Sequence, residues 1–247
     1  MRARRTGRRE GNILNKTIVV VGGSTGIGRA IAAGFASEDR TSVIATGHER
    51  VGHDEVPAGV ESVVLDVREA EAISSFFSAF DRLDVLVNCA GIIRRQGAEF
   101  RQADFAEVVD VNLNGTQRCC EAAFPSLKAA KGCVINTASM LTFFGSGTSP
   151  AYAASKGGVG QLTKSLAVAW AADGIRVNAL APGWIETALT AALGQDETKS
   201  NAILGRTPMR RWGRPEDLAG PAQFLASPAA AFVTGAILPV DGGFSAA

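Results

Sequence analysis

The sequence predicts an α/β fold in which helices cover both faces of a doubly wound parallel sheet of about seven strands. Short apolar runs rich in Val and Ile alternate with helical patterns along the chain, which favours parallel strands joined by crossover helices. A glycine-rich turn directly follows the first of these runs. Right-handed crossovers would place a ligand beyond the carboxyl ends of the strands, where the strand order reverses.

The expected elements follow one another in alternating order. Seven short apolar runs are predicted to be strands: 17–21, 42–46, 62–65, 84–88, 133–137, 176–179 and 237–240. Helical periodicity predicts helices over 27–37, 70–80, 105–130, 152–172 and 215–225, and Pro215 suits the start of the last one. The late region 183–208 is the least regular, and we expect it to form a lid over the substrate.

Length and charge favour one domain. A chain of 247 residues, 46% hydrophobic and 20% charged, can bury a single core, which we expect over 13–247. Residues 1–12 are predicted to be a basic, disordered arm, since five arginines against Glu10 give residues 1–10 a charge of +4. The whole chain carries +1, so the rest carries −3, and such a body offers no electrostatic footprint for nucleic acid.

Cysteines and apolar runs bear on the compartment. The four cysteines are not spaced like metal ligands, so we expect no metal site and free, buried thiols in a reducing environment. No apolar run is long enough to span a bilayer, and the N-terminus lacks the apolar segment of a signal peptide. The sequence therefore predicts a cytoplasmic protein without a membrane partner.

The glycine-rich turn joins the first strand to the first helix. Glycines stand at 22, 26 and 28, and missing Cβ atoms or positive φ angles are needed where a pyrophosphate approaches the backbone. The positive end of the helix would then face the phosphates. A tight turn without a ligand is the alternative, but the placement between strand and helix favours dinucleotide binding by Gly22, Ser24, Thr25, Gly26, Ile27 and Gly28.

The only tyrosine of the chain, Tyr152, stands four residues before Lys156. On a helix these side chains share a face, and an ammonium beside a phenol lowers the phenol pKa, which starts at about 10. Tyr152 is therefore a candidate general acid/base. Ser139 follows the strand 133–137 at the carboxyl edge of the sheet, where a hydroxyl can hydrogen-bond a carbonyl oxygen. Both histidines lie far upstream, which disfavours a Ser-His-Asp hydrolase.

From about Lys16 to Gly243 the sequence resembles the short-chain dehydrogenases/reductases, which have a Rossmann-type fold. The resemblance lies in ordered motifs: VGGSTGIG (21–28), LDV (65–67), NCAG (88–91), VNLNG (111–115), NTAS (136–139), YAASK (152–156), VNALAPGWIET (177–187) and VDGG (240–243). Each motif is modest alone, and their order and spacing make the resemblance specific. Two positions depart from the commonest pattern: Val21 stands where the family often has Thr, and Cys89 where it often has Asn.

The resemblance implies a catalytic tetrad of Asn112, Ser139, Tyr152 and Lys156. Tyr152 would exchange a proton with the substrate oxygen, which Ser139 would orient. Lys156 would lower the Tyr152 pKa and hold the nicotinamide ribose, and Asn112 would anchor a water that links Lys156 to solvent. The resemblance also implies cofactor contacts by Asp66, Val67, Asn88, Ala90, Gly91, Pro182, Gly183, Ile185 and Thr187.

The sequence leaves the choice between NAD and NADP open. A carboxylate at the end of the second strand binds the ribose of NAD, whereas a basic residue accommodates the phosphate of NADP. Gly47 occupies this position, so the carboxylate is missing. His48 or Arg50 could receive a phosphate, but Glu49 would repel one.

Some stretches resemble the sugar-acid and polyol dehydrogenases of the family, a group that includes 2-keto-3-deoxygluconate and gluconate 5-dehydrogenases. These stretches are NCAGIIRR (88–95), ASML (138–141) and residues 203–221. A guanidinium at the edge of the site can clamp a carboxylate, so Arg94 and Arg95 are candidate substrate residues. Both could instead serve subunit contacts or face solvent. Met140 and Trp184 are further candidates, for which packing in the lid is the alternative.

We therefore expect an NAD(P)-dependent oxidoreductase that transfers hydride between the cofactor and a secondary alcohol or ketone of a sugar acid or polyol. One alternative is a 3-oxoacyl thioester reductase, which would need a basic patch for an acidic carrier protein; the acidic body disfavours it. A non-catalytic nucleotide-binding protein on the same fold is the other alternative, disfavoured by the complete tetrad. The resemblance also implies a homotetramer in which the helices around 105–130 and 152–172 pair across a two-fold axis.

Overall fold

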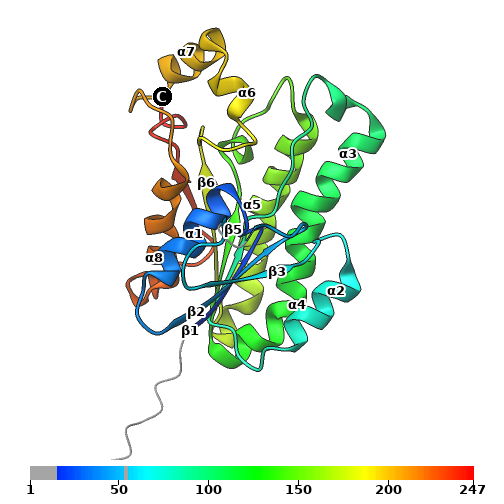
Figure 1. Ribbon diagram of the computed structural model, residues 1–247, viewed down its shortest axis with the longest axis vertical. Coiled ribbons are helices and arrows are strands. Elements are labelled where there is room, and N and C mark those ends of the chain that lie inside the picture. The colour runs from blue at the N-terminus through cyan, green and yellow to red at the C-terminus, as the bar shows by residue number, and fades with distance from the viewer. Residues whose placement is uncertain (1–15, 53–54) are drawn as a thin grey trace, which may run out of the picture.

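The computed structural model describes residues 16–52 and 55–247, so the predicted arm 1–12 and the start of the predicted domain lie outside the described residues. Seven parallel strands form one sheet in the order β3-β2-β1-β4-β5-β6-β7 (Figure 1). The strands are β1 (Lys16–Val21), β2 (Thr41–Gly47), β3 (Val60–Val64), β4 (Val85–Asn88), β5 (Cys133–Thr137), β6 (Arg176–Pro182) and β7 (Ile237–Val240). The predicted fold class is confirmed.

The order of the strands places a crevice in the middle of the sheet. β1 pairs with β2 on one side and with β4 on the other, so the chain crosses back over the sheet between β3 and β4. Ligands of such sheets bind beyond the carboxyl ends of the strands at this reversal. In Figure 1 these ends point upward, and α6 (Ala191–Gly194) and α7 (Glu197–Arg206) lie above them.

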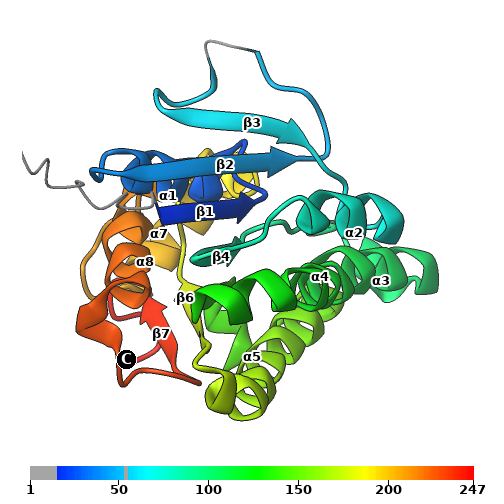
Figure 2. The same cartoon turned by 90° about the horizontal axis from the view of Figure 1, so that it is seen from below.

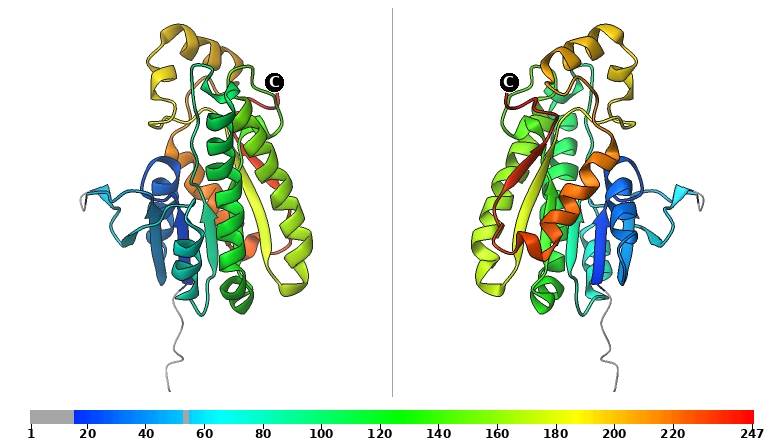
Figure 3. Two further views of the ribbon diagram at one scale, coloured as in Figure 1. Left: turned by 90° about the vertical axis from the view of Figure 1, so that its right-hand side faces the viewer. Right: turned by 90° about the vertical axis from the view of Figure 1, so that its left-hand side faces the viewer.

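Helices cover both faces of the sheet (Figures 2 and 3). One face carries α1 (Gly26–Ala36) and α8 (Ala219–Ala226), and the other carries α2 (Ala70–Ser78), α4 (Gly115–Ala130) and α5 (Pro150–Trp170). β1 supplies alternate side chains to the two cores: Ile18 and Val20 pack with Phe35 of α1, whereas Val19 and Val21 face α2 and α4. A strand buried on both faces explains why this run is continuously apolar.

Two regions differ from the predicted elements. The predicted helix 105–130 is divided into α3 (Gln102–Val109), the π-helical turn η3 (Asp110–Asn114) and α4. π-helical turns often occur at functional sites, and Asn112 lies in the middle of this one. The predicted lid region 183–208 contains α6 and α7 rather than wholly irregular chain.

Candidate active site

The glycine turn between β1 and α1 brings two stretches of backbone into close contact. Gly22 has a φ of +73°, and a Cβ there would lie 2.4 Å from the Ala90 backbone nitrogen. A Cβ on Gly28 would lie 2.2 Å from the Gly22 carbonyl oxygen. Because the Thr25 side chain makes no capping hydrogen bond, the first N–H groups of α1 are available to an anion. The turn therefore fits a pyrophosphate.

A cavity of about 720 Å³ opens beside this turn, a size typical of ligand sites. It extends from the end of β2 to Tyr152 on α5, which suits an elongated ligand. Many of the residues that the sequence predicted for the site line this cavity: Gly22, Ser24, Thr25, Gly26, Ile27, Gly28, His48, Asp66, Val67, Ala90, Gly91, Arg94, Tyr152, Lys156 and Thr187. The structure thus brings together motifs that are far apart in the sequence.

Four residues predicted to contact the cofactor lie behind the lining. Asn88 is 3% exposed, with its amide hydrogen-bonded inside the core. Ile185 packs in the core on the α1 side of the sheet. Pro182 ends β6, and a Cβ on Gly183 would lie 2.7 Å from the Asp241 Cα. None of these four residues is among those that line the cavity.

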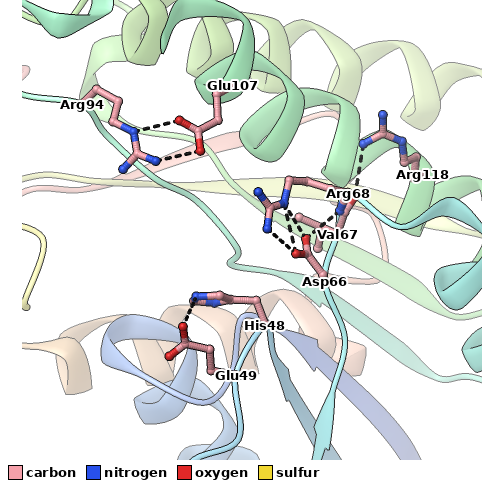
Figure 4. Close-up of polar contacts among 8 residues, drawn as sticks. All are labelled: His48, Glu49, Asp66, Val67, Arg68, Arg94, Glu107 and Arg118. Carbon is pink, nitrogen blue, oxygen red and sulfur yellow. Dashed lines mark hydrogen bonds and ion pairs between the residues drawn. The ribbon is translucent and has the colours of Figure 1, made fainter. Parts of the chain in front are cut away.

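Charged side chains at the β2 end of the cavity are held in pairs (Figure 4). The Arg68 guanidinium donates to both oxygens of Asp66, and these hydrogen bonds lower the pKa of the Asp66 carboxyl. His48 Nε2 lies 3.5 Å from a Glu49 carboxylate oxygen. The Asp66 carboxylate, which was predicted to contact adenine, is therefore hydrogen-bonded to Arg68. An adenine amino group would bind Asp66 beside this arginine or displace it.

The two arginines after β4 have different surroundings. The Arg94 guanidinium donates to both oxygens of Glu107 on α3, at 2.9 and 2.7 Å (Figure 4). Arg95 forms no ion pair with a described residue; it donates to the Leu189 carbonyl oxygen at 2.8 Å. The positive charge of Arg95 also lowers the pKa of Tyr152, so Arg95 is the arginine that acts on the phenol.

Tyr152 is partly buried near the start of α5. Burial raises the pKa of its phenol, whereas a hydrogen bond with Ser139 and the charge of Arg95 lower it. Ser139 is itself held in place: its hydroxyl accepts the Leu141 N–H, and its own N–H donates to the Thr142 hydroxyl. The phenol and the serine hydroxyl can therefore act on one oxygen atom together.

The pKa of Tyr152 is raised, whereas the sequence predicted that Lys156 would lower it. Lys156 is 4% exposed, and its ammonium donates to the Thr137 carbonyl oxygen at 2.6 Å and lies 5.7 Å from the centre of the Tyr152 ring. Burial lowers the pKa of Lys156 itself to about 8. The pKa of Tyr152 is raised overall because desolvation outweighs Ser139 and Arg95. The prediction failed because it considered the helical offset and not the burial of both groups.

Asn112 braces the loop after β4 against α5. Its amide oxygen accepts the Ile92 N–H at 2.8 Å, and its amide nitrogen donates to the Ile92 carbonyl and the Ser155 hydroxyl, both at 3.0 Å. Ser155 donates in turn to the Tyr152 carbonyl at 2.8 Å. The side chain in the π-helical turn is thus connected to the backbone of the candidate acid/base.

Of the predicted substrate residues, Arg94 lines the cavity, whereas Arg95, Met140 and Trp184 are not among the residues that line it. Met140 is 4% exposed. Trp184 packs edge-on against Trp212 and Phe244, with ring centres 6.0 and 6.4 Å away. Its indole N–H is buried without a hydrogen-bond partner among the described residues.

Sequence reasoning missed several residues on or beside the cavity. Cys89 and Thr137 line it, and their places at the ends of β4 and β5 could have indicated this. Leu189 also lines it, but only the folded course of the chain after β6 brings it there. Glu99, which is fully buried and bonded to the Tyr152 backbone, had no signal in the sequence.

Metal ligands and membrane spans were sought among the described residues. No group of three or more His, Cys, Asp or Glu side chains in 16–52 and 55–247 could hold a metal ion. None of the helices in these ranges has the length and apolar character needed to cross a bilayer. All four cysteines are free thiols, and burial raises the pKa of each.

A dinucleotide could lie with its pyrophosphate on the glycine turn and its reactive end beside Tyr152. When bound, a nicotinamide supplies or accepts the hydride, while a phenol can exchange the proton. The fold and the site thus define the class of protein: a dinucleotide-dependent oxidoreductase of alcohols and ketones.

Comparisons with known proteins agree with this class. A family model described as enoyl-(acyl carrier protein) reductase matches residues 21–245. The 2-dehydro-3-deoxy-D-gluconate 5-dehydrogenase of Bacillus subtilis (strain 168) is 43% identical over 94% of this chain and 96% of its own. The enzyme of the same name from Pseudoalteromonas atlantica is 41% identical over 93% and 95%. A solved gluconate 5-dehydrogenase from Burkholderia cenocepacia, in complex with NADP and tartrate, has a TM-score of 0.87 at 33% identity and covers 95% of this chain and 97% of its own.

The chain belongs to the short-chain dehydrogenase/reductase family. It is an NAD(P)-dependent oxidoreductase that acts on a CH–OH group.

Proposed function

We propose that the enzyme interconverts a secondary alcohol and a ketone on a sugar acid, with Arg95 binding the substrate carboxylate. The observation that carries the proposal is the place of Arg95: it forms no ion pair with a described residue, and its guanidinium donates at 2.8 Å to the carbonyl of Leu189, which lines the same cavity as Tyr152. A guanidinium binds a carboxylate through two parallel hydrogen bonds. The names of the relatives from Bacillus subtilis and Pseudoalteromonas atlantica, both sugar-acid dehydrogenases, support this substrate class.

In this proposal each member of the tetrad has one task. Tyr152 takes the hydroxyl proton during oxidation and returns it during reduction. Ser139 hydrogen-bonds the same oxygen and keeps it beside the phenol. Lys156 holds the ribose hydroxyls of the cofactor, and Asn112 fixes the loop after β4 against α5. The predicted cofactor residues that line the cavity hold the rest of the dinucleotide.

A substrate screen tests the proposed class. Initial rates are followed by the absorbance of the reduced cofactor with 2-dehydro-3-deoxygluconate, gluconate, a polyol and a 3-oxoacyl thioester. We expect the highest kcat/KM with a sugar acid. The description of the matching family model as a carrier-protein reductase favours the thioester as the second candidate, and a preference for the thioester would replace our proposal.

Replacing Arg95 by Met is expected to lower kcat/KM for a sugar acid by about 100-fold, because a charge-assisted hydrogen bond contributes about 1.5–3 kcal/mol. The rate with a polyol, which lacks a carboxylate, should change much less. The matched control is Arg101→Met, since Arg101 is exposed and pairs with Asp104 on the surface. A sugar-acid kcat/KM that stays at the parent value in R95M would assign the carboxylate to another residue.

We also propose that the enzyme accepts NADP. Gly47 ends β2, and a Cβ there would lie 2.3 Å from the Ser24 hydroxyl oxygen, so no carboxylate side chain fits at this position without moving Ser24. Arg50 and Arg68 line the same part of the cavity. NADP is also the cofactor in the solved relative from Burkholderia cenocepacia.

Replacing Arg50 by Ala is expected to lower kcat/KM for NADP about tenfold while changing that for NAD little, because only NADP carries the extra phosphate. The ratio of the two kcat/KM values in parent and variant provides the measurement. An unchanged ratio would exclude Arg50 from the phosphate site, and a parent enzyme inactive with NADP would contradict the cofactor proposal itself.

The predicted homotetramer remains part of the proposal. Val168 on α5 is 83% exposed and Phe105 on α3 is 39% exposed, and exposed apolar side chains on packed helices are typical of subunit contacts. Light scattering coupled to size-exclusion chromatography tests the tetramer. Val168→Glu is expected to reduce the assembly, whereas a monomeric parent would contradict it.

A further inference from the structure

Glu99 is a buried carboxylate with no part in the chemistry described so far. It lies in the short helix η2 (Ala98–Phe100), is 0% exposed and forms no ion pair with any described residue. Its Oε1 accepts the Arg94 backbone N–H at 2.9 Å, and its Oε2 accepts the Tyr152 backbone N–H at 2.9 Å. Since burial of a carboxylate is costly without such bonds, the two amides show what Glu99 holds in place.

A tight turn brings Glu99 back to Arg94. Gln96 and Gly97 have φ angles of +58° and +75°, two consecutive residues in the left-handed region. This conformation is unfavourable for a residue with a side chain such as Gln96. The chain therefore maintains a strained turn, and its result is the position of the Glu99 carboxylate.

The second contact caps helix α5. Pro150 occupies the first turn, the Ser149 side chain makes no capping hydrogen bond, and the N–H of Tyr152 is one of the donors left free there. Glu99 supplies the missing acceptor from a segment 53 residues away in the sequence. Its negative charge also suits the positive end of the helix.

We propose that Glu99 is a positioning residue that fixes the Tyr152 phenol relative to the Arg95 guanidinium. Its carboxylate holds the backbone of Tyr152 and of the residue directly before Arg95. A carboxylate bound by Arg95 would then present one particular carbon atom of the substrate to the phenol, so Glu99 helps to select the position that is oxidised. The inference rests on the proposed role of Arg95.

Glu99 also acts on the phenol through its charge. It raises the pKa of Tyr152, whereas Arg95 lowers it. Two other charged side chains of the same cavity have partners of their own. Arg94 pairs with Glu107 on α3, and Lys156, 5.7 Å from the centre of the Tyr152 ring, donates to the Thr137 carbonyl. Removal of the Glu99 charge should therefore shift the titration of the phenol to lower pH.

The first test is a spectroscopic titration that needs no substrate. Because the chain has a single tyrosine, the absorbance of tyrosinate follows Tyr152 alone. We expect Glu99→Gln to titrate at lower pH than the parent, and Glu121→Gln, a control on the exposed face of α4, to titrate like the parent. Circular dichroism at each pH verifies the fold. A folded E99Q that titrates like the parent overturns the proposal.

The second test is kinetic and separates positioning from a merely structural role. A glutamine side chain has one oxygen that accepts hydrogen bonds, and its amide nitrogen can only donate. In E99Q one of the two backbone N–H groups therefore loses its acceptor. We expect E99Q to lose about tenfold more kcat/KM with a sugar acid than with a polyol. Equal losses with both substrates overturn the proposal. If E99Q does not fold, Glu99→Asp takes its place: it keeps the charge, and it should show the same selective loss with an unshifted titration.

The two tests also distinguish this inference from the proposed function. A shifted titration in an enzyme whose parent does not turn over sugar acids would reject the substrate class. It would still support the coupling of Glu99 to Tyr152.

Discussion

Replacing Tyr152 by Phe is expected to lower turnover by about 1,000-fold and to leave cofactor binding within about twofold of the parent, since positioned acid/base groups contribute about 10²–10⁴ in rate. The variant keeps the ring in its partly buried place and loses only the hydroxyl. Its backbone N–H still donates to Glu99, so the start of α5 should not change. The loss therefore measures the proton exchange rather than the fold.

Steady-state rates in both directions, together with fluorescence titration of the reduced cofactor, measure the two effects of Y152F. In the parent, alcohol oxidation should become faster as the pH rises, because the phenolate is the base and burial raises the pKa of Tyr152. The residual rate of the variant should lack this dependence. A Phe variant that turns over at the parent rate would remove Tyr152 from the mechanism.

The fold could be predicted because its signals are local. Apolar runs mark strands buried on both faces, and two of them, 133–137 and 237–240, coincide with β5 and β7. The break in the predicted helix 105–130 had no such signal. It lies where Asn112 hydrogen-bonds Ile92, a partner twenty residues earlier, and tertiary contacts of this kind cannot be read from helical periodicity.

The site was predictable where chemistry depends on spacing along one element. The glycine turn and the offset between Tyr152 and Lys156 are of this kind, and all of these residues line one cavity. Arg94 and Arg95 are the same residue type side by side, and only the fold distinguishes them: Arg94 lines the cavity and pairs with Glu107, whereas Arg95 donates to the Leu189 carbonyl. The direction of the Tyr152 pKa shift also depends on burial, which the sequence does not encode locally.

Replacing Lys156 by Met is expected to lower turnover by about 100-fold or more. The same substitution should raise the free energy of unfolding of the ligand-free protein. Lys156 is 4% exposed, and burial lowers the pKa of its ammonium from 10.5 to about 8. In the unfolded chain the group keeps its ordinary pKa, so below about pH 8 the folded state carries a buried charge at a cost of up to about 3 kcal/mol. Methionine has a similar length without the charge, so the cost disappears.

The sign of the pH dependence follows from proton binding. Between about pH 8 and pH 10.5 the unfolded parent holds the Lys156 proton that the folded parent has lost, so its free energy of unfolding gains a contribution that rises with pH. The advantage of K156M should therefore be largest near neutral pH and disappear above pH 10.5.

Urea unfolding at about pH 7 and about pH 10 measures the difference between K156M and the parent. Lys164→Met, at an exposed position of the same helix, should show no such trend. If the free energies of unfolding of K156M and the parent differed by the same amount at both pH values, burial of the ammonium would cost nothing. The presence of Lys156 in the site would then need no functional explanation, whereas a stabilised but inactive variant would show that stability is given up for a cation that faces the ligand.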